Sequence, residues 1–129
     1  MAAVTVVKAR YVTPVNYEVI DKCVLSEAVV AGDQLVFTGT VTNGLPVMSK
    51  APTAGITEAH GMAIKDGYAA QEGFEVLIQG EMDGFSGLTP GNPIYPSTAT
   101  AGKLDTTAIA SATVRVRAIR ATRIRVSYV

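Results

Sequence analysis

The fold is decided by the stretch from Gly73 to Pro96, which reads GFEVLIQGEMDGFSGLTPGNPIYP. Across Phe74–Gln79 the residues alternate with the period of two that sends successive side chains to opposite faces of a sheet. Pro93–Pro96 is a second extended segment, with a proline at each end that cannot donate to a strand ladder. Glycines break the stretch where the backbone has to turn tightly or take a positive φ: Gly80, Gly84, Gly87 and Gly91. The stretch therefore predicts a strand, a set of sharp turns and a second strand.

Similar strand patterns recur along the rest of the chain. Strands are predicted at Val4–Val12, Glu18–Leu25, Leu35–Val41, Gly61–Ile64 and Val114–Val129. No window keeps an apolar stripe with the 3.6-residue period of a helix for three turns. The sequence therefore predicts a domain that is almost entirely β.

Three short signals predict how these strands begin and end. Asn43–Gly44 lies between two apolar runs and favours a two-residue hairpin, because both residues tolerate the positive φ of a type I′ turn. Val47–Met48 is bracketed by Pro46 and Pro52, which predicts a short segment at a sheet edge. The alternation of the last strand changes phase at Arg120–Ala121, which indicates a bulge or a tight turn.

Length and composition limit the class of protein. A chain of 129 residues with 48% hydrophobic and 17% charged residues is one lightly charged globular domain. Eleven basic and eleven acidic residues cancel, so the net charge favours neither nucleic acid nor a membrane as a partner. No apolar run approaches the ~20 residues that a bilayer span needs, and Met1–Lys8 lacks the pattern of a secretory signal. We expect a soluble protein made in a cytoplasm.

Residues able to carry chemistry are few. Cys23 is the single cysteine, which excludes an internal disulfide and a cysteine-rich metal site. His60 is the single histidine and is expected to be a surface or turn residue. Glu81 and Asp83 resemble a solvated strand end more than a calcium loop, which needs more oxygen ligands in order. We therefore predict no catalytic, cofactor-binding or metal-binding residues.

The arginines of the last segment stand out. Arg115, Arg117, Arg123 and Arg125 share one parity, so a strand would present their guanidinium groups on one face. One interpretation is a solvated sheet face that protects an edge against aggregation. The other is a docking surface for the carboxylates of a protein partner, which the guanidinium fork matches with two hydrogen bonds. Nucleic acid is a weaker candidate, because aromatic residues are not interleaved with the arginines.

The order of several short motifs resembles the small capsid-decoration (cement, or head-stabilisation) proteins of tailed bacteriophages. The motifs lie at Ser26–Asp33, Gly61–Ile64, Ala70–Gly73, Ile78–Glu81, Leu88–Tyr95 and Val114–Val126. The resemblance implies a compact β-barrel or β-tulip-like domain with short or no helices, preceded by an extended arm or first strand over residues 1–16. Residues 17–129 would then form a single β-barrel-like decoration domain.

The same resemblance implies a structural protein of the virion. It would form a homotrimer on the outer capsid surface, bind the major capsid protein and stabilise the assembled head by bridging capsomers. No cofactor, nucleic acid or membrane would be involved. The resemblance also implies that the chain is not an enzyme. The alternative is a ligand- or carbohydrate-binding β-module of a phage or bacterial surface assembly, and a third class is an oligomeric β-barrel enzyme whose site forms between subunits.

Two groups of residues are candidates for the contacts with the shell. An extended arm rich in valine and threonine can add a strand to a neighbour's exposed edge, and termini gain order when a partner binds them. The first group therefore lies in the N-terminal segment: Val4, Val6, Lys8 and Arg10. The arginine row is the second group, and it is equally suited to contacts between subunits: Arg115, Arg117, Arg123 and Arg125.

Overall fold

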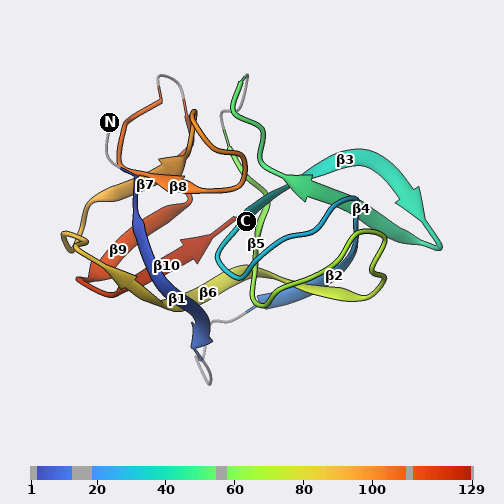
Figure 1. Ribbon diagram of the computed structural model, residues 1–129, viewed down its shortest axis with the longest axis horizontal. Coiled ribbons are helices and arrows are strands. Elements are labelled where there is room, and N and C mark those ends of the chain that lie inside the picture. Colours follow the sequence, from blue (N-terminus) through green and yellow to red (C-terminus); the bar gives the residue numbers. More distant parts are fainter. Residues whose placement is uncertain (1–2, 13–18, 55–57, 110–111, 129) are drawn as a thin grey trace.

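The computed structural model describes residues 3–12, 19–54, 58–109 and 112–128, and within these ranges it contains strands and no helix (Figure 1). The predicted all-β class is confirmed. The strands are β1 (Thr5–Val12), β2 (Val19–Leu25), β3 (Gln34–Thr42), β4 (Leu45–Lys50), β5 (Gly61–Ala63), β6 (Phe74–Ser86), β7 (Pro93–Pro96), β8 (Leu104–Asp105), β9 (Val116–Arg120) and β10 (Arg123–Ser127).

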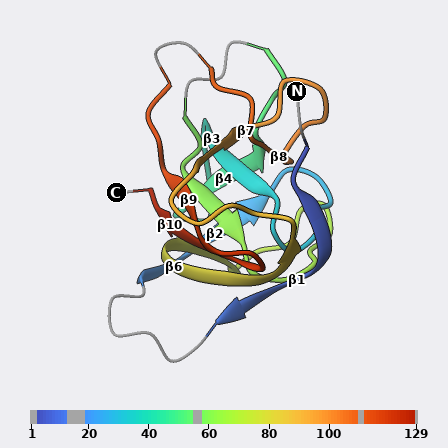
Figure 2. The same cartoon turned by 90° about the vertical axis from the view of Figure 1, so that its left-hand side faces the viewer.

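The long strand β6 is the centre of the sheet, and in Figure 2 it forms a curved band across the lower half of the molecule. The predicted break at Gly80 and Gly84 is wrong, because β6 runs through both glycines for 13 residues. Both residues keep a positive φ, 154° at Gly80 and 95° at Gly84. The strand continues because neighbouring strands pair with it around both positions, and the glycines supply the bend without ending it.

Four strands share the two edges of β6. On one edge lie β1, which pairs with Glu81–Ser86, and β2, which pairs with Phe74–Gln79. On the other edge lie β10, which pairs with Gln79–Asp83, and β5, which pairs with Val76 and Leu77. All four pairings are antiparallel. Within the segment predicted as an arm or first strand, residues 1–16, Thr5–Val12 is thus a strand of the sheet that pairs with β6, whereas residues 1–2 and 13–16 lie outside the described part of the chain.

The sheet is not a closed barrel. Its hydrogen-bonded order is β2-β4-β3-β5-β6-β10-β9-β7-β8, with a further pairing between β2 and β6. That pairing brings β2 next to β6, so the sheet curls round over the strands β2, β4, β3, β5 and β6. The strands β10, β9, β7 and β8 continue outward from β6 and do not close. The predicted edge position of Val47–Met48 is wrong, since β4 lies between β3 and a parallel β2.

Two hydrophobic cores meet at β6. Phe74 and Val76 belong to the core inside the curled strands. Leu77 and Met82 belong to the second core, between the outer strands and the rest of the molecule. Because adjacent residues of a strand point to opposite faces, Val76 and Leu77 enter different cores. The alternating side chains of the central stretch therefore contribute to both cores.

The hairpin predicted at Asn43–Gly44 is confirmed. Asn43 and Gly44 have φ values of 51° and 82°, and the residues that flank them, Thr42 and Leu45, pair across the turn. The change of phase in the last segment is the tight turn between β9 and β10, which carries a register shift next to the pairing of Arg123 with Arg120.

Candidate docking face

Charged residues meet in rows across four neighbouring strands, β9, β10, β6 and β1. The sequence neighbours of these charged residues, such as Met82, Ile124 and Val126, are buried in the second core. The alternation of a strand therefore places the charged set on the opposite, outer face. One row pairs Arg117 with Arg125, Arg125 with Glu81 and Glu81 with Val12; the next pairs Arg120 with Arg123, Arg123 with Asp83 and Asp83 with Arg10.

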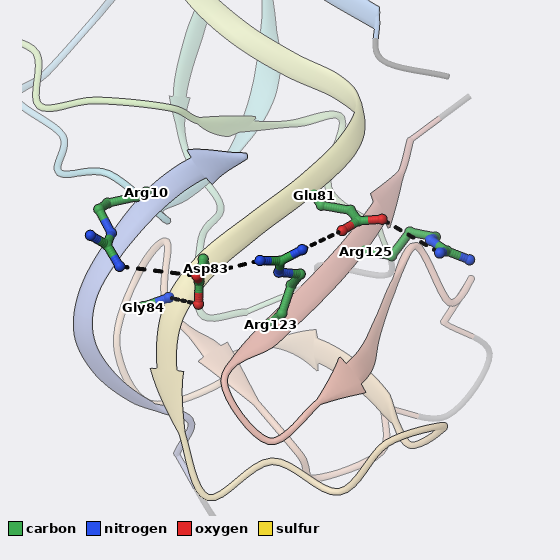
Figure 3. A network of polar contacts seen from close by, with 6 residues as sticks. All are labelled: Arg10, Glu81, Asp83, Gly84, Arg123 and Arg125. Atoms are coloured by element: carbon green, nitrogen blue, oxygen red, sulfur yellow. Dashed lines mark hydrogen bonds and ion pairs between the residues drawn. The ribbon is translucent and has the colours of Figure 1, made fainter. Parts of the chain in front are cut away.

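Side-chain contacts link these rows into one network (Figure 3). Glu81 lies between Arg123 and Arg125, with nitrogen–oxygen distances of 3.4 and 3.5 Å. Asp83 lies between Arg123 at 3.7 Å and Arg10 at 4.0 Å. The Glu81 side chain is only 10% exposed, so its carboxylate depends on these guanidinium groups for charge compensation.

This network joins two segments that are far apart in the sequence. Arg10 comes from β1 and Arg123 from β10, and both contact the carboxylate of Asp83 on β6. Arg10 from the first group of predicted contact residues and Arg123 from the second therefore meet on one face of the molecule. We call the outer face of β9, β10, β6 and β1 the docking face.

Cations outnumber anions on the docking face. Glu81 and Asp83 are its carboxylates in the two rows, whereas Arg10, Arg123 and Arg125 already surround them. Arg117 adds a further positive charge, and its hydrogen bond goes to the neutral carbonyl oxygen of Gly91 at 3.1 Å. A surface with this balance is complementary to carboxylates on a partner.

Arg115 differs from the other three arginines of the predicted row. It precedes β9, and its guanidinium group donates two hydrogen bonds to Glu58 Oε2, at 2.7 and 3.2 Å. These hydrogen bonds and the positive charge of Arg115 lower the pKa of the Glu58 carboxyl, with a smaller contribution from His60. Sequence parity grouped Arg115 with the other three arginines but could not reveal a carboxylate 57 residues away.

A shallow groove of about 290 Å³ opens on the docking face beside Arg117. Its lining combines three guanidinium groups with small and apolar residues: Arg115, Arg117, Arg125, Gly91, Val114, Ala118, Ile119 and Ser127. The pairing of Arg117 with Pro93 brings the loop that carries Gly91 to its rim. The groove therefore offers positive charge above an apolar floor.

The predicted contact residues of β1 differ in accessibility. Val4 is partly buried against the core, and its amide donates to the carbonyl oxygen of Leu104. Val6 is 45% exposed and Lys8 is exposed, whereas Arg10 joins the network at Asp83. Val7 was not among the predicted contact residues but is 73% exposed, and β1 carries a register shift between Val6 and Arg10. A second groove, of about 670 Å³, runs between β1 and residues 30–31 and 64–66.

The path of β1 over the sheet depends on Gly84. A Cβ at this position would overlap with the carbonyl group of Lys8, so only glycine lets the two backbones approach this closely. The amide of Gly84 donates to Asp83 Oδ1 at 2.7 Å, which orients the carboxylate that Arg10 and Arg123 share. The local backbone therefore positions the charge network.

The other two candidates from the sequence, Cys23 and His60, have contacts that are typical of residues with a structural role. Cys23 is fully buried, and burial together with the charge of Asp21 raises its thiol pKa to about 11, which makes it a poor nucleophile. His60 accepts a hydrogen bond from the Phe37 amide through Nδ1 at 3.0 Å and stacks on the Phe37 ring. Within the described part of the chain, no three His, Cys, Asp or Glu residues are grouped so as to hold a metal ion. The described residues also contain no helix long and apolar enough to cross a membrane.

No family model, no curated protein and no solved structure matches this chain.

Proposed function

We propose that this chain is a capsid-decoration (cement) protein of a tailed bacteriophage. In this role it binds the major capsid protein on the outer surface of the assembled head and stabilises the head by bridging capsomers. The observation that carries the proposal is the docking face, on which β1 and the β9–β10 hairpin flank the same half of β6. The motif order of the sequence supports the same role.

The physical basis of such stabilisation is linkage. A protein that binds the assembled shell, and not its dissociated subunits, shifts the equilibrium towards the shell by mass action. Contacts with two capsomers at once raise the effective concentration of the second contact. Guanidinium groups held on a rigid sheet, such as Arg123 between Glu81 and Asp83, lose little conformational freedom when a partner carboxylate binds nearby.

The first prediction tests this role directly. We expect the purified chain to co-sediment with undecorated heads of the phage that encodes it and to raise the temperature at which those heads break. Lys8→Glu should weaken co-sedimentation roughly fivefold to tenfold, because it reverses an exposed charge on β1 worth about 1 kcal/mol. Lys22→Glu is the matched control, since it makes the same change on the exposed part of β2 and should bind as the native chain does.

Two results would contradict the role. If the native chain does not co-sediment with undecorated heads, it is not a decoration protein. If it binds heads without raising their breakage temperature, it is a surface module without a cementing role, as in the ligand- or carbohydrate-binding alternative.

A further inference from the structure

The groove beside Arg117 is chemically distinct from the rest of the docking face. Elsewhere on the face, Arg10 and Arg123 reach Glu81 or Asp83. In the groove, Arg117 contacts a neutral carbonyl group, and Val114 and Ile119 contribute apolar surface beside it. A cation above an apolar floor is suited to a ligand that has both a negative charge and an aliphatic stem.

The register of the hairpin places two like charges opposite each other in this groove. Arg117 and Arg125 are direct partners across β9 and β10. Like charges directly opposite in a sheet destabilise it, so this pairing works against the fold. Arg125 also reaches Glu81 at 3.5 Å, but Arg117 has no carboxylate within the described part of the chain. An external anion between the two guanidinium groups would relieve the repulsion.

We propose that this groove is a receptor for a carboxylate side chain of an acidic segment, held between the guanidinium forks of Arg117 and Arg125. The inference rests on the proposed function, and it names the chemistry of the shell surface that the docking face meets: an extended acidic segment of the capsid protein. The methylene groups of a glutamate pack against Ile119 and Val114 while its carboxylate accepts hydrogen bonds from Arg117.

Size and an aliphatic stem distinguish this ligand from other anions. A volume of about 290 Å³ is at the lower end of the range for ligand pockets, roughly 300–1,000 Å³, so it suits one or two side chains. A phosphate group matches a guanidinium fork equally well but has no aliphatic stem for the apolar floor.

The second prediction is measured on the full chain with a blocked octaglutamate peptide. We expect saturable changes in the amide resonances of Gly91, Ala118 and Ser127, which line the groove. Arg117→Gln should weaken peptide binding about tenfold or more, since it removes a charge-assisted hydrogen-bonding group. The peptide affinity of Arg117→Lys should lie between those of the native chain and Arg117→Gln, because lysine keeps the charge but loses the two-pronged guanidinium group. Inorganic phosphate at equal ionic strength should change the same resonances far less.

Arg120→Gln is the matched control, because Arg120 is exposed on the same hairpin and does not line the groove. It should keep peptide affinity within about twofold of the native value, as expected for a screened surface charge. The thermal midpoint of Arg117→Gln should equal or exceed that of the native chain, because the like-charge pair is gone. If Arg117 had only a structural role, the Arg117→Gln substitution would lower the thermal midpoint instead.

The outcomes separate this inference from the proposed function. Equal losses in Arg117→Gln and Arg120→Gln, equal responses to phosphate and peptide, or no response at Gly91 and Ala118 would each overturn the receptor. If one of these results is found but the native chain still decorates and stabilises heads, the proposed function stands and the groove is not the contact with the shell. If the native chain binds the peptide through Arg117 but never binds heads, the receptor stands and the capsid role fails.

Discussion

At the scale of single residues, Gly84 shows how one missing side chain organises the docking face. It has a φ of 95° and faces the carbonyl group of Lys8, while its own amide holds Asp83. Gly87 also has a positive φ, 72°, but a Cβ there would meet open space. Substitutions at these two glycines therefore distinguish the cost of a positive φ, which both positions share, from the cost of the close contact with Lys8, which only Gly84 has.

The third prediction uses this difference. Gly84→Ala should lower the free energy of unfolding by at least about 2 kcal/mol, because the added methyl group pushes β1 away from β6 and also takes an unfavourable φ. Gly87→Ala should cost only about 1 kcal/mol, from backbone strain alone. Urea denaturation of both variants measures the difference. Equal costs would mean that the approach of Lys8 to Gly84 does not constrain the fold.

The charged residues of the face show a second point at this scale. Glu81 is almost buried and contacts two arginines, so its surroundings are those of a compensated interior charge. Asp83 and Arg10 are more exposed, and a contact of 4.0 Å between them contributes little to stability. The docking face therefore has an almost buried, charge-compensated carboxylate at Glu81 and more exposed charged side chains at Asp83 and Arg10.

At the scale of elements, β1 is both a structural strand and a candidate contact. It pairs with β6 from Thr5 to Val12, and Ala9 belongs to the second core, where it adjoins Gly32. Its other edge has no strand partner among the residues that the structure describes. The exposed Val6 and Val7 lie on the same strand. Binding and folding therefore use different parts of one element.

The fourth prediction follows from this double role. Deleting residues 2–10 should lower the thermal midpoint and promote aggregation, because it removes Ala9 from the core and exposes the β6 edge at Asp83–Ser86. Lys8→Glu should leave the midpoint within about 2 °C of the native value, since an exposed substitution usually changes stability little. Thermal unfolding followed by circular dichroism measures both. An unchanged midpoint after the deletion would show that β1 is a dispensable arm.

At the scale of the whole molecule, exposed apolar residues favour self-association. Val6 and Val7 on β1, and Val19 and Ile20 on β2, are between 36% and 73% exposed. These two strands lie end to end along the same edge of β6. Exposed apolar groups on sheet-edge strands are typical of surfaces that another chain covers.

The fifth prediction is a homotrimer. Sedimentation at micromolar concentration should give a species about three times the 13.4 kDa of the chain. Val7→Lys should shift this species towards monomer, because it places a charge in the apolar edge. Val41→Lys is the control, since Val41 is 67% exposed on β3, away from that edge, and should leave the trimer intact. A native chain that stays monomeric when concentrated would contradict the prediction.

The sequence by itself determined the local features of this protein. The alternation of Phe74–Gln79 specifies a strand because neighbouring side chains must point to opposite faces. Asn43–Gly44 specifies a hairpin because these residues accept the positive φ of the turn. Parity also placed Arg117 and Arg125 on one face. Each of these inferences depends on steric effects within a few residues, so no partner strand had to be known.

Only the tertiary structure decided which strands pair and which charges meet. Gly80 and Gly84 lie inside β6 because strands on both edges hold the backbone extended, an effect that the local sequence cannot report. The contacts of Arg123 with Glu81 and of Arg115 with Glu58 join residues 42 and 57 positions apart. Hydrogen bonding along sheet edges creates such non-local contacts, and they made one docking face from two separate segments of the chain.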